Sequence, residues 1–254
     1  MREVLEAVAA GELSVSEAEA RLAGYVTTGA GRFDAAREER RGVPEGILAE
    51  DKTPAEVAAL AAAALDSTGH ALVTRVADED VDAITEEVDA SVELAHDERA
   101  RTLVARAAEY EPPSLDATVA LVAGGTADAG VIGEAAAVLE EMGVTPERIE
   151  DVGVAHLGRV LDHLDTLRAA DVLVVAAGRE GALPTIVAGL VDTPVVGVPV
   201  STGYGHGGDG AAALAGMLQS CTVLSVVNVD AGFVAGAQAG LVARAVSAAR
   251  PDAD

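Results

Sequence analysis

The stretch Asp171-Val-Leu-Val-Val-Ala-Ala177 decides the fold, because its apolar residues run on without the alternation typical of a half-buried strand. It ends in Gly178-Arg179-Glu180-Gly181, and a helical pattern follows from about Ala182 to Leu190. A second continuous apolar run, Pro194–Val200, comes next. Apolar strands separated by helical segments predict a parallel sheet with helices on both faces.

The same alternation extends outward along the chain and defines two predicted domains. Residues 116–254 are predicted to form a three-layer, doubly wound α/β domain. Residues 1–115 are predicted to form a small α+β domain that ends near the break Glu111-Pro112-Pro113-Ser114. The further strands expected are Thr118–Ala123, Ile149–Leu157, Thr222–Val229 and, in the first domain, His70–Val76. The further helices expected are Asp128–Glu141, Gly158–Ala169, Phe233–Ala249 and, with Thr53 as its cap, Thr53–Ser67.

The composition excludes several classes of protein. The 254 residues include 42 acidic and 17 basic ones, and the formal net charge is −25. Such an acidic balance argues against a protein that binds nucleic acid or docks on an anionic membrane, because both kinds of binding need clustered Lys and Arg. We interpret the even acidity as adaptation to a salt-rich cytoplasm; a GC-rich genome with ordinary acidity is the alternative. No secretory signal and no apolar run of about 20 residues is found, so we expect a cytoplasmic protein outside the membrane.

Small and polar residues follow four of the predicted strands. Because ligands bind beyond the carboxyl ends of parallel strands, we expect these segments to meet at one rim. Glycines let backbone N–H groups approach phosphate, Glu180 is suited to moving a proton, and Arg179 is suited to holding a carboxylate. An ordinary turn, a surface ion pair and a surface loop are the alternatives. The four segments are Gly124-Gly125-Thr126-Ala127-Asp128, Gly178–Gly181, Ser201-Thr202-Gly203-Tyr204-Gly205 and Asn228-Val229-Asp230-Ala231-Gly232.

Three further features are ambiguous from spacing alone. Cys221 is the single cysteine, which rules out an internal disulfide and a cysteine-cluster metal site, and a buried inert thiol is its usual role. The cluster Arg37, Arg40 and Arg41 forms either a solvated helix face or an anion-binding patch. His206 has no second histidine or cysteine at metal-ligand spacing.

Taken together, these segments resemble the LarB family, whose catalytic part is similar to the PurE family of aminoimidazole ribonucleotide carboxylases and mutases. The resemblance spans about residues 30 to 245. Two departures are notable: Ala127 stands where related enzymes have serine, and Ala182 stands where the purine enzymes carry a catalytic histidine. The segments that carry the resemblance are Gly124–Asp128, Asp171–Pro184, Val198–Gly205, Ser220-Cys221 with Asn228–Asp230, and upstream Phe33-Asp34, Arg37, Arg40, Arg41–Glu45, Lys52-Thr53 and Thr74-Arg75.

The resemblance implies carboxylation of the pyridinium ring of nicotinic acid adenine dinucleotide, with hydrolysis of its phosphoanhydride. The products are AMP and pyridinium-3,5-biscarboxylic acid mononucleotide, in the first step of nickel-pincer nucleotide cofactor biosynthesis. Cys221 is then the nucleophile and leaving group, and Glu180 or Asp128 is the base. The residues expected to bind substrate are Gly124, Gly125, Thr126, Gly178, Arg179, Ser201, Thr202, Gly203, Asn228, Asp230, Arg37, Arg40, Arg41 and Lys52.

The resemblance also implies partners. We expect a homo-oligomer, an octamer as in the related fold, with carbon dioxide or bicarbonate as co-substrate and no organic cofactor. A magnesium ion bridging the phosphates is compatible with the chemistry, although no motif requires it. The alternatives are an aminoimidazole ribonucleotide carboxylase or mutase and a non-catalytic nucleotide-binding module.

Overall fold

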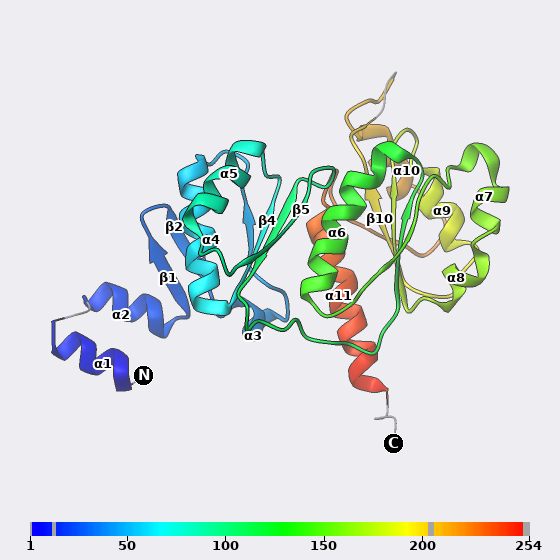
Figure 1. Cartoon of the computed structure of the whole chain (residues 1–254). Helices are drawn as coiled ribbons and strands as arrows, with labels where there is room; N and C mark the ends of the chain where they lie inside the picture. The colour runs from blue at the N-terminus through cyan, green and yellow to red at the C-terminus, as the bar shows by residue number, and fades with distance from the viewer. Residues whose placement is uncertain (1, 12–13, 203–205, 251–254) are drawn as a thin grey trace. The chain divides into compact units, whose positions relative to one another are not determined.

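The computed structural model describes residues 2–11, 14–202 and 206–250 and divides into two compact units (Figure 1). The first unit comprises residues 1–97 and 101–111, and the second comprises residues 98–100 and 112–254. Each unit has its own hydrophobic core, so each is described by itself.

The first unit is a small α+β fold. Its four-stranded sheet has the order β3-β4-β6-β5, with β3 parallel to β4 and the other pairs antiparallel, and β1 and β2 form a separate hairpin. Helix α4 begins as its sequence predicts, since Thr53 and Glu56 form a capping box and Pro54 is the first helical residue. The elements are α1 (Arg2–Ala9), α2 (Val15–Leu22), β1 (Tyr25–Thr28), β2 (Gly31–Asp34), α3 (Arg37–Arg41), β3 (Gly46–Leu48), α4 (Pro54–Thr68), β4 (His70–Thr74), α5 (Asp78–Glu87), β5 (Glu93–Asp97) and β6 (Thr102–Arg106).

The second unit is the predicted doubly wound α/β fold. Its five strands are all parallel, in the order β11-β10-β9-β7-β8. The elements are β7 (Val119–Ala123), the 3-10 turn η1 (Thr126–Asp128), α6 (Ala129–Glu141), β8 (Glu147–Ile149), η2 (Val154–His156), α7 (Gly158–Leu161), α8 (Leu164–Ala169), β9 (Val172–Ala177), α9 (Ala182–Ala188), β10 (Val195–Pro199), α10 (Ala211–Leu218), β11 (Ser225–Val226) and α11 (Gly232–Ala249).

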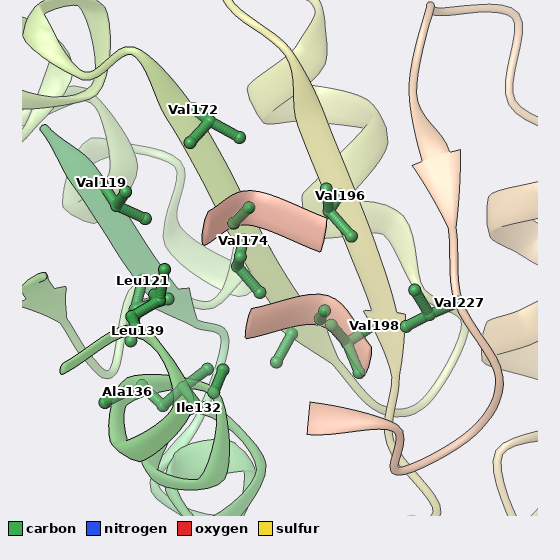
Figure 2. Packing of buried hydrophobic residues seen from close by; sticks show 14 of the residues in the cluster. Val119, Leu121, Ile132, Ala136, Leu139, Val172, Val174, Val196, Val198 and Val227 are labelled. Atoms are coloured by element: carbon green, nitrogen blue, oxygen red, sulfur yellow. The ribbon is translucent and has the colours of Figure 1, made fainter. Parts of the chain in front are cut away.

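Both faces of the parallel sheet are buried, which explains the continuous apolar runs. Val172, Val174 and Ala176 of β9 pack toward α6 and α11, as Figure 2 shows for the valines. The alternate residues Leu173 and Val175 belong to the core on the other face, where α7, α8, α9 and α10 contribute residues. The helices therefore form the two outer layers of a three-layer domain (Figure 1).

Helix α11 covers the central strands. Among the described residues it is the one helix whose length and composition would suit a membrane span. Its alanines Ala235, Ala239 and Ala243 are completely buried in the core against the sheet, and α11 lies beside α6 (Figure 1). These contacts identify α11 as a covering helix of the folded domain.

Three predicted elements were wrong in extent. The strand expected over Ile149–Leu157 is β8, which ends at Ile149, because the chain turns at Asp151 (φ +59°) and Val152 donates to the carbonyl of Ala123. The strand expected over Thr222–Val229 has only two paired residues at the sheet edge. The helix expected over Gly158–Ala169 is divided into α7 and α8.

Candidate active site at the carboxyl edge of the parallel sheet

A cleft of about 470 Å³ opens where the strands β7, β8, β9 and β10 end. Its walls combine glycine and alanine with a few polar groups, and its larger apolar side chains are Val154 and Leu183. Three of the four segments expected at one rim contribute to this cleft. The lining residues are Gly124, Gly125, Ala127, Asp128, Gly153, Val154, Ala155, Ala177, Gly178, Arg179, Glu180, Ala182, Leu183 and Thr202.

Asp128 is the buried acid of the cleft, with 5% of its surface exposed. Its Oδ2 accepts a hydrogen bond from the backbone N–H of Gly125 (2.9 Å), and its Oδ1 accepts one from the Thr202 hydroxyl (3.4 Å). Burial raises the pKa of the Asp128 carboxyl above its ordinary value; the two hydrogen bonds oppose this rise, and the negative charge of Asp230 adds to it. The acid thus joins the turn after β7 to the segment after β10.

Asp230 stabilises the segment that leads into the cleft from β10. Its Oδ1 accepts a hydrogen bond from the N–H of Ser201 (2.9 Å), and its own N–H donates to the carbonyl of Pro199 (2.9 Å). Asp230 adopts a left-handed backbone conformation (φ +54°), which is uncommon for a residue other than glycine. Neither Asp230 nor Ser201 lines the cleft. Asp230 instead contacts the loop that leads to Thr202.

The turn after β9 presents two charged side chains to the cleft. Arg179 and Glu180 are both exposed, and Arg179 has a left-handed backbone (φ +52°). The turn is bounded by Gly178 and Gly181. A Cβ at Gly178 would overlap the carbonyl oxygen of Thr202, so glycine is required where these two segments meet.

The wall that follows β8 was not predicted from the sequence. Gly153, Val154 and Ala155 line the cleft, and a Cβ at Gly153 would lie 2.7 Å from the carbonyl oxygen of Gly124. This loop was not expected because a strand was predicted over Ile149–Leu157. The polar pair Glu150-Asp151 followed by Gly153 was the available signal, because it resembles the other strand ends.

Cys221 does not line the cleft; it is exposed in the segment between α10 and β11. Ser225 pairs with Val196, near the start of β10, and Cys221 precedes Ser225 by four residues. Its neighbour Thr222 donates to the carbonyl of Thr185 in α9 and lies near Gly189, where that helix ends. The register therefore places the thiol toward the amino edge of the sheet, away from the cleft.

The other predicted residues of this unit are close to the rim without lining the cleft. The carbonyl oxygen of Thr126 accepts a hydrogen bond from the Arg99 side chain, and the side-chain oxygen of Asn228 accepts one from the N–H of Val229. Gly203 lies outside the described residues.

Three of the four predicted cations of the first unit bind groups within that unit. Arg37 pairs with Glu45 (2.9 Å), and Arg40 binds both carboxylate oxygens of Asp34 (2.6 and 2.7 Å). Lys52 donates to the carbonyl of Leu48 (2.6 Å). Arg41 is exposed. The contribution of these four cations to substrate binding stays a prediction.

Over the described ranges 2–11, 14–202 and 206–250, no group of three or more His, Cys, Asp or Glu side chains converges as a metal-ligand set. A magnesium ion at this cleft would therefore need substrate phosphates and water as most of its ligands.

Known proteins match both parts of the chain. Residues 25–107 match the LarB/PurE-like N-terminal domain, and residues 118–253 match the AIR carboxylase domain. The chain belongs to the LarB family. This LarB-family chain is also 36% identical over 220 residues to a protein of Methanocaldococcus jannaschii named Uncharacterized protein MJ0165, and the alignment covers 84% of each chain. The matched domains indicate a carboxylase-type enzyme of the LarB/PurE family.

Proposed function

We propose that this protein carboxylates the pyridinium ring of nicotinic acid adenine dinucleotide and hydrolyses its phosphoanhydride, as the first step of nickel-pincer nucleotide cofactor biosynthesis. One observation carries the proposal: Arg179, Glu180 and Ala182 line a single cleft in a chain with both LarB and AIR carboxylase domains. Ala182 has no group that transfers a proton where the purine enzymes use histidine. The cleft thus offers an acid–base group and an anion partner without the purine enzymes' imidazole.

The ring must first be made nucleophilic, because a pyridinium carbon does not attack carbon dioxide. Addition of a thiolate at ring C4 gives a 1,4-dihydropyridine in which C5 is an enamine carbon. C5 then forms a bond to carbon dioxide, and a base removes the C5 proton. The C4–S bond breaks, which restores the aromatic ring and returns the thiolate. Cys221 is the thiol of the chain and takes this role in our proposal.

Glu180 is assigned as the base that takes the C5 proton. Its side chain is exposed at the cleft, whereas Asp128 is buried and both of its carboxylate oxygens already accept hydrogen bonds. A base must reach the proton that it removes, and an engaged carboxylate is less available for this task. Asp128 is assigned to ordering the turn Gly124–Asp128 for phosphate, and Arg179 to holding a substrate carboxylate.

The thiol must come from a second copy of the chain in this proposal, because the register places Cys221 away from the cleft of its own chain. Two large apolar side chains near Cys221 are exposed: Leu218 has 66% and Val223 has 94% of its surface accessible. Exposed apolar residues grouped in this way favour a protein contact. A homo-oligomer in which this segment covers a neighbouring cleft brings all the reacting groups together.

The first experiment follows the products by mass spectrometry. Nicotinic acid adenine dinucleotide, bicarbonate and magnesium are supplied at high salt, with and without a chelator. We expect the carboxylated mononucleotide and AMP, and no conversion of aminoimidazole ribonucleotide. Folded protein that gives no product would overturn the proposal, and conversion of the purine intermediate would support the alternative. Loss of hydrolysis with the chelator would assign the magnesium ion to that step.

The second experiment tests the shared site. Cys221→Ala and Glu180→Gln each retain only a small residual activity in the proposal, but they remove groups from different copies at any one cleft. Mixing the unfolded variants and refolding them together should restore up to about a quarter of the wild-type activity, because some clefts then combine an intact Glu180 with an intact Cys221. Each variant refolded alone is the control. A mixture as inactive as its components would place both groups on one chain.

A further inference from the structure

The turn that carries Glu180 is packed between backbone segments on two sides. On one side, a Cβ at Gly178 would overlap the carbonyl oxygen of Thr202. On the other side, a Cβ at Gly181 would lie 2.5 Å from the carbonyl oxygen of Ala213, in helix α10. Both contacts come from the chain after β10, so one segment holds the turn from both directions.

Helix α10 approaches the backbone of Glu180 closely at Gly216. A Cβ at Gly216 would overlap the carbonyl oxygen of Glu180. Gly216 lies in the interior of an otherwise helix-favouring sequence, Ala211-Ala-Ala-Leu-Ala-Gly-Met-Leu218. Glycine is a poor helix former, and alanine at this position would favour the helix. The local sequence therefore does not explain Gly216, whereas the contact with Glu180 does.

We infer that Gly216 is a positioning residue, whose missing side chain lets α10 hold the Glu180 peptide where its carboxylate meets the substrate. This inference rests on the proposed role of Glu180 as the base. Gly216 does not line the cleft, so it acts through the turn and not on the substrate. Because misplacement of a catalytic group by about 1 Å can reduce the rate about 100-fold, a single added methyl group is a sensitive probe.

The test is a double-mutant cycle between Gly216→Ala and Glu180→Gln in the full chain. We expect Gly216→Ala to lower kcat about 10-fold or more, with little change in KM, because the substrate contacts remain. In the Glu180→Gln background the same substitution should have almost no further effect. Gly189→Ala is the matched control, since its added Cβ would make only ordinary contacts, the nearest at 3.4 Å. Equal losses in both backgrounds would overturn the inference.

Two further measurements keep the inference separate from the proposed function and from folding. If wild-type protein forms no carboxylated product, the proposed function fails. The crystal structure of Gly216→Ala then tests the positioning alone. A displaced Glu180 carbonyl supports the inference, and a displaced α10 beside an unmoved Glu180 overturns it. If Gly216→Ala does not fold, Ala213→Gly replaces it in the cycle, because it weakens helix α10 at the residue whose carbonyl faces Gly181 and adds no atom.

Discussion

The two edges of the parallel sheet are built in opposite ways. At the carboxyl edge, segments from four strands approach so closely that glycine is required at Gly153 and Gly178, and the acid Asp128 is buried. Toward the amino edge, the segment between α10 and β11 exposes Cys221 and Val223. At the carboxyl edge the segments are held together by contacts within the chain, whereas the segment toward the amino edge exposes a thiol and an apolar side chain to solvent.

This difference shows what a single chain completes and what it leaves to a partner. Asp128, Arg179, Glu180 and Thr202 meet in the cleft without help from a second chain. The thiol of Cys221 does not line this cleft. Substitutions of buried groups at the carboxyl edge should therefore alter the stability of the folded chain itself, and those toward the amino edge should alter assembly and the reaction.

The largest effect is expected at Cys221. Cys221→Ala removes the proposed nucleophile, so carboxylation should fall by about 10³-fold or more, while the exposed site leaves the fold unchanged. Rates of product formation and circular dichroism measure the two quantities. Ser220→Ala is the control, and it should keep near wild-type activity. Normal carboxylation by Cys221→Ala would contradict the proposed role of the thiol. A second copy of the chain would then not be needed to supply it.

A smaller effect is expected where Glu134 supports the carboxyl edge. The Oε2 of this buried residue of α6 accepts a hydrogen bond from the N–H of Phe233 (3.0 Å), in the first turn of α11. The N-cap residue of α11 makes no side-chain hydrogen bond of its own. Glu134→Ala should lower the free energy of unfolding by about 1–2 kcal/mol, as the loss of a helix cap does. Urea denaturation measures this change. Glu140→Ala on the same helix is the control, since its contact with Arg148 is long (4.0 Å) and partly exposed.

Asp128 should make stability depend on pH in a defined direction. Its pKa is raised in the folded chain, so the folded state holds this proton to higher pH than the unfolded state. Its contribution is complete below about pH 3.9 and is lost as the pH rises through the raised pKa. Relative to Asp128→Asn, the wild-type free energy of unfolding should therefore fall with rising pH. Chemical denaturation of both proteins from pH 4 to 8 checks this; parallel curves would contradict the burial argument.

The smallest effect on the chain itself is expected at Val223. Because 94% of its surface is exposed, Val223→Ser should change the free energy of unfolding of a separate chain by less than about 0.5 kcal/mol. The same substitution should weaken the proposed homo-oligomer, which light scattering detects as a lower mass upon dilution. An unchanged mass at every concentration would show that this segment is not the contact surface.

The alternation of apolar strands and helices was sufficient to predict the parallel sheet. A strand such as Val172–Ala177, buried on both faces, must be apolar at every position, so its pattern is visible without a structure. The strand ends were predictable for the same reason, since all parallel strands end at one edge. The loop Gly153–Ala155 was missed because the apolar residues beyond Ile149 also fit a strand.

The sequence by itself determined the sheet, its buried strands and the glycine-rich turns, because these follow from local patterns. The tertiary structure alone decided which groups meet. Thr202 and Asp128 are 74 residues apart, and Glu134 and Phe233 are 99 apart. The contact of Gly216 with Glu180 and the separation of Cys221 from the cleft likewise depend on strand order and register. No local pattern encodes these relations, because they arise only when distant segments pack against the same sheet.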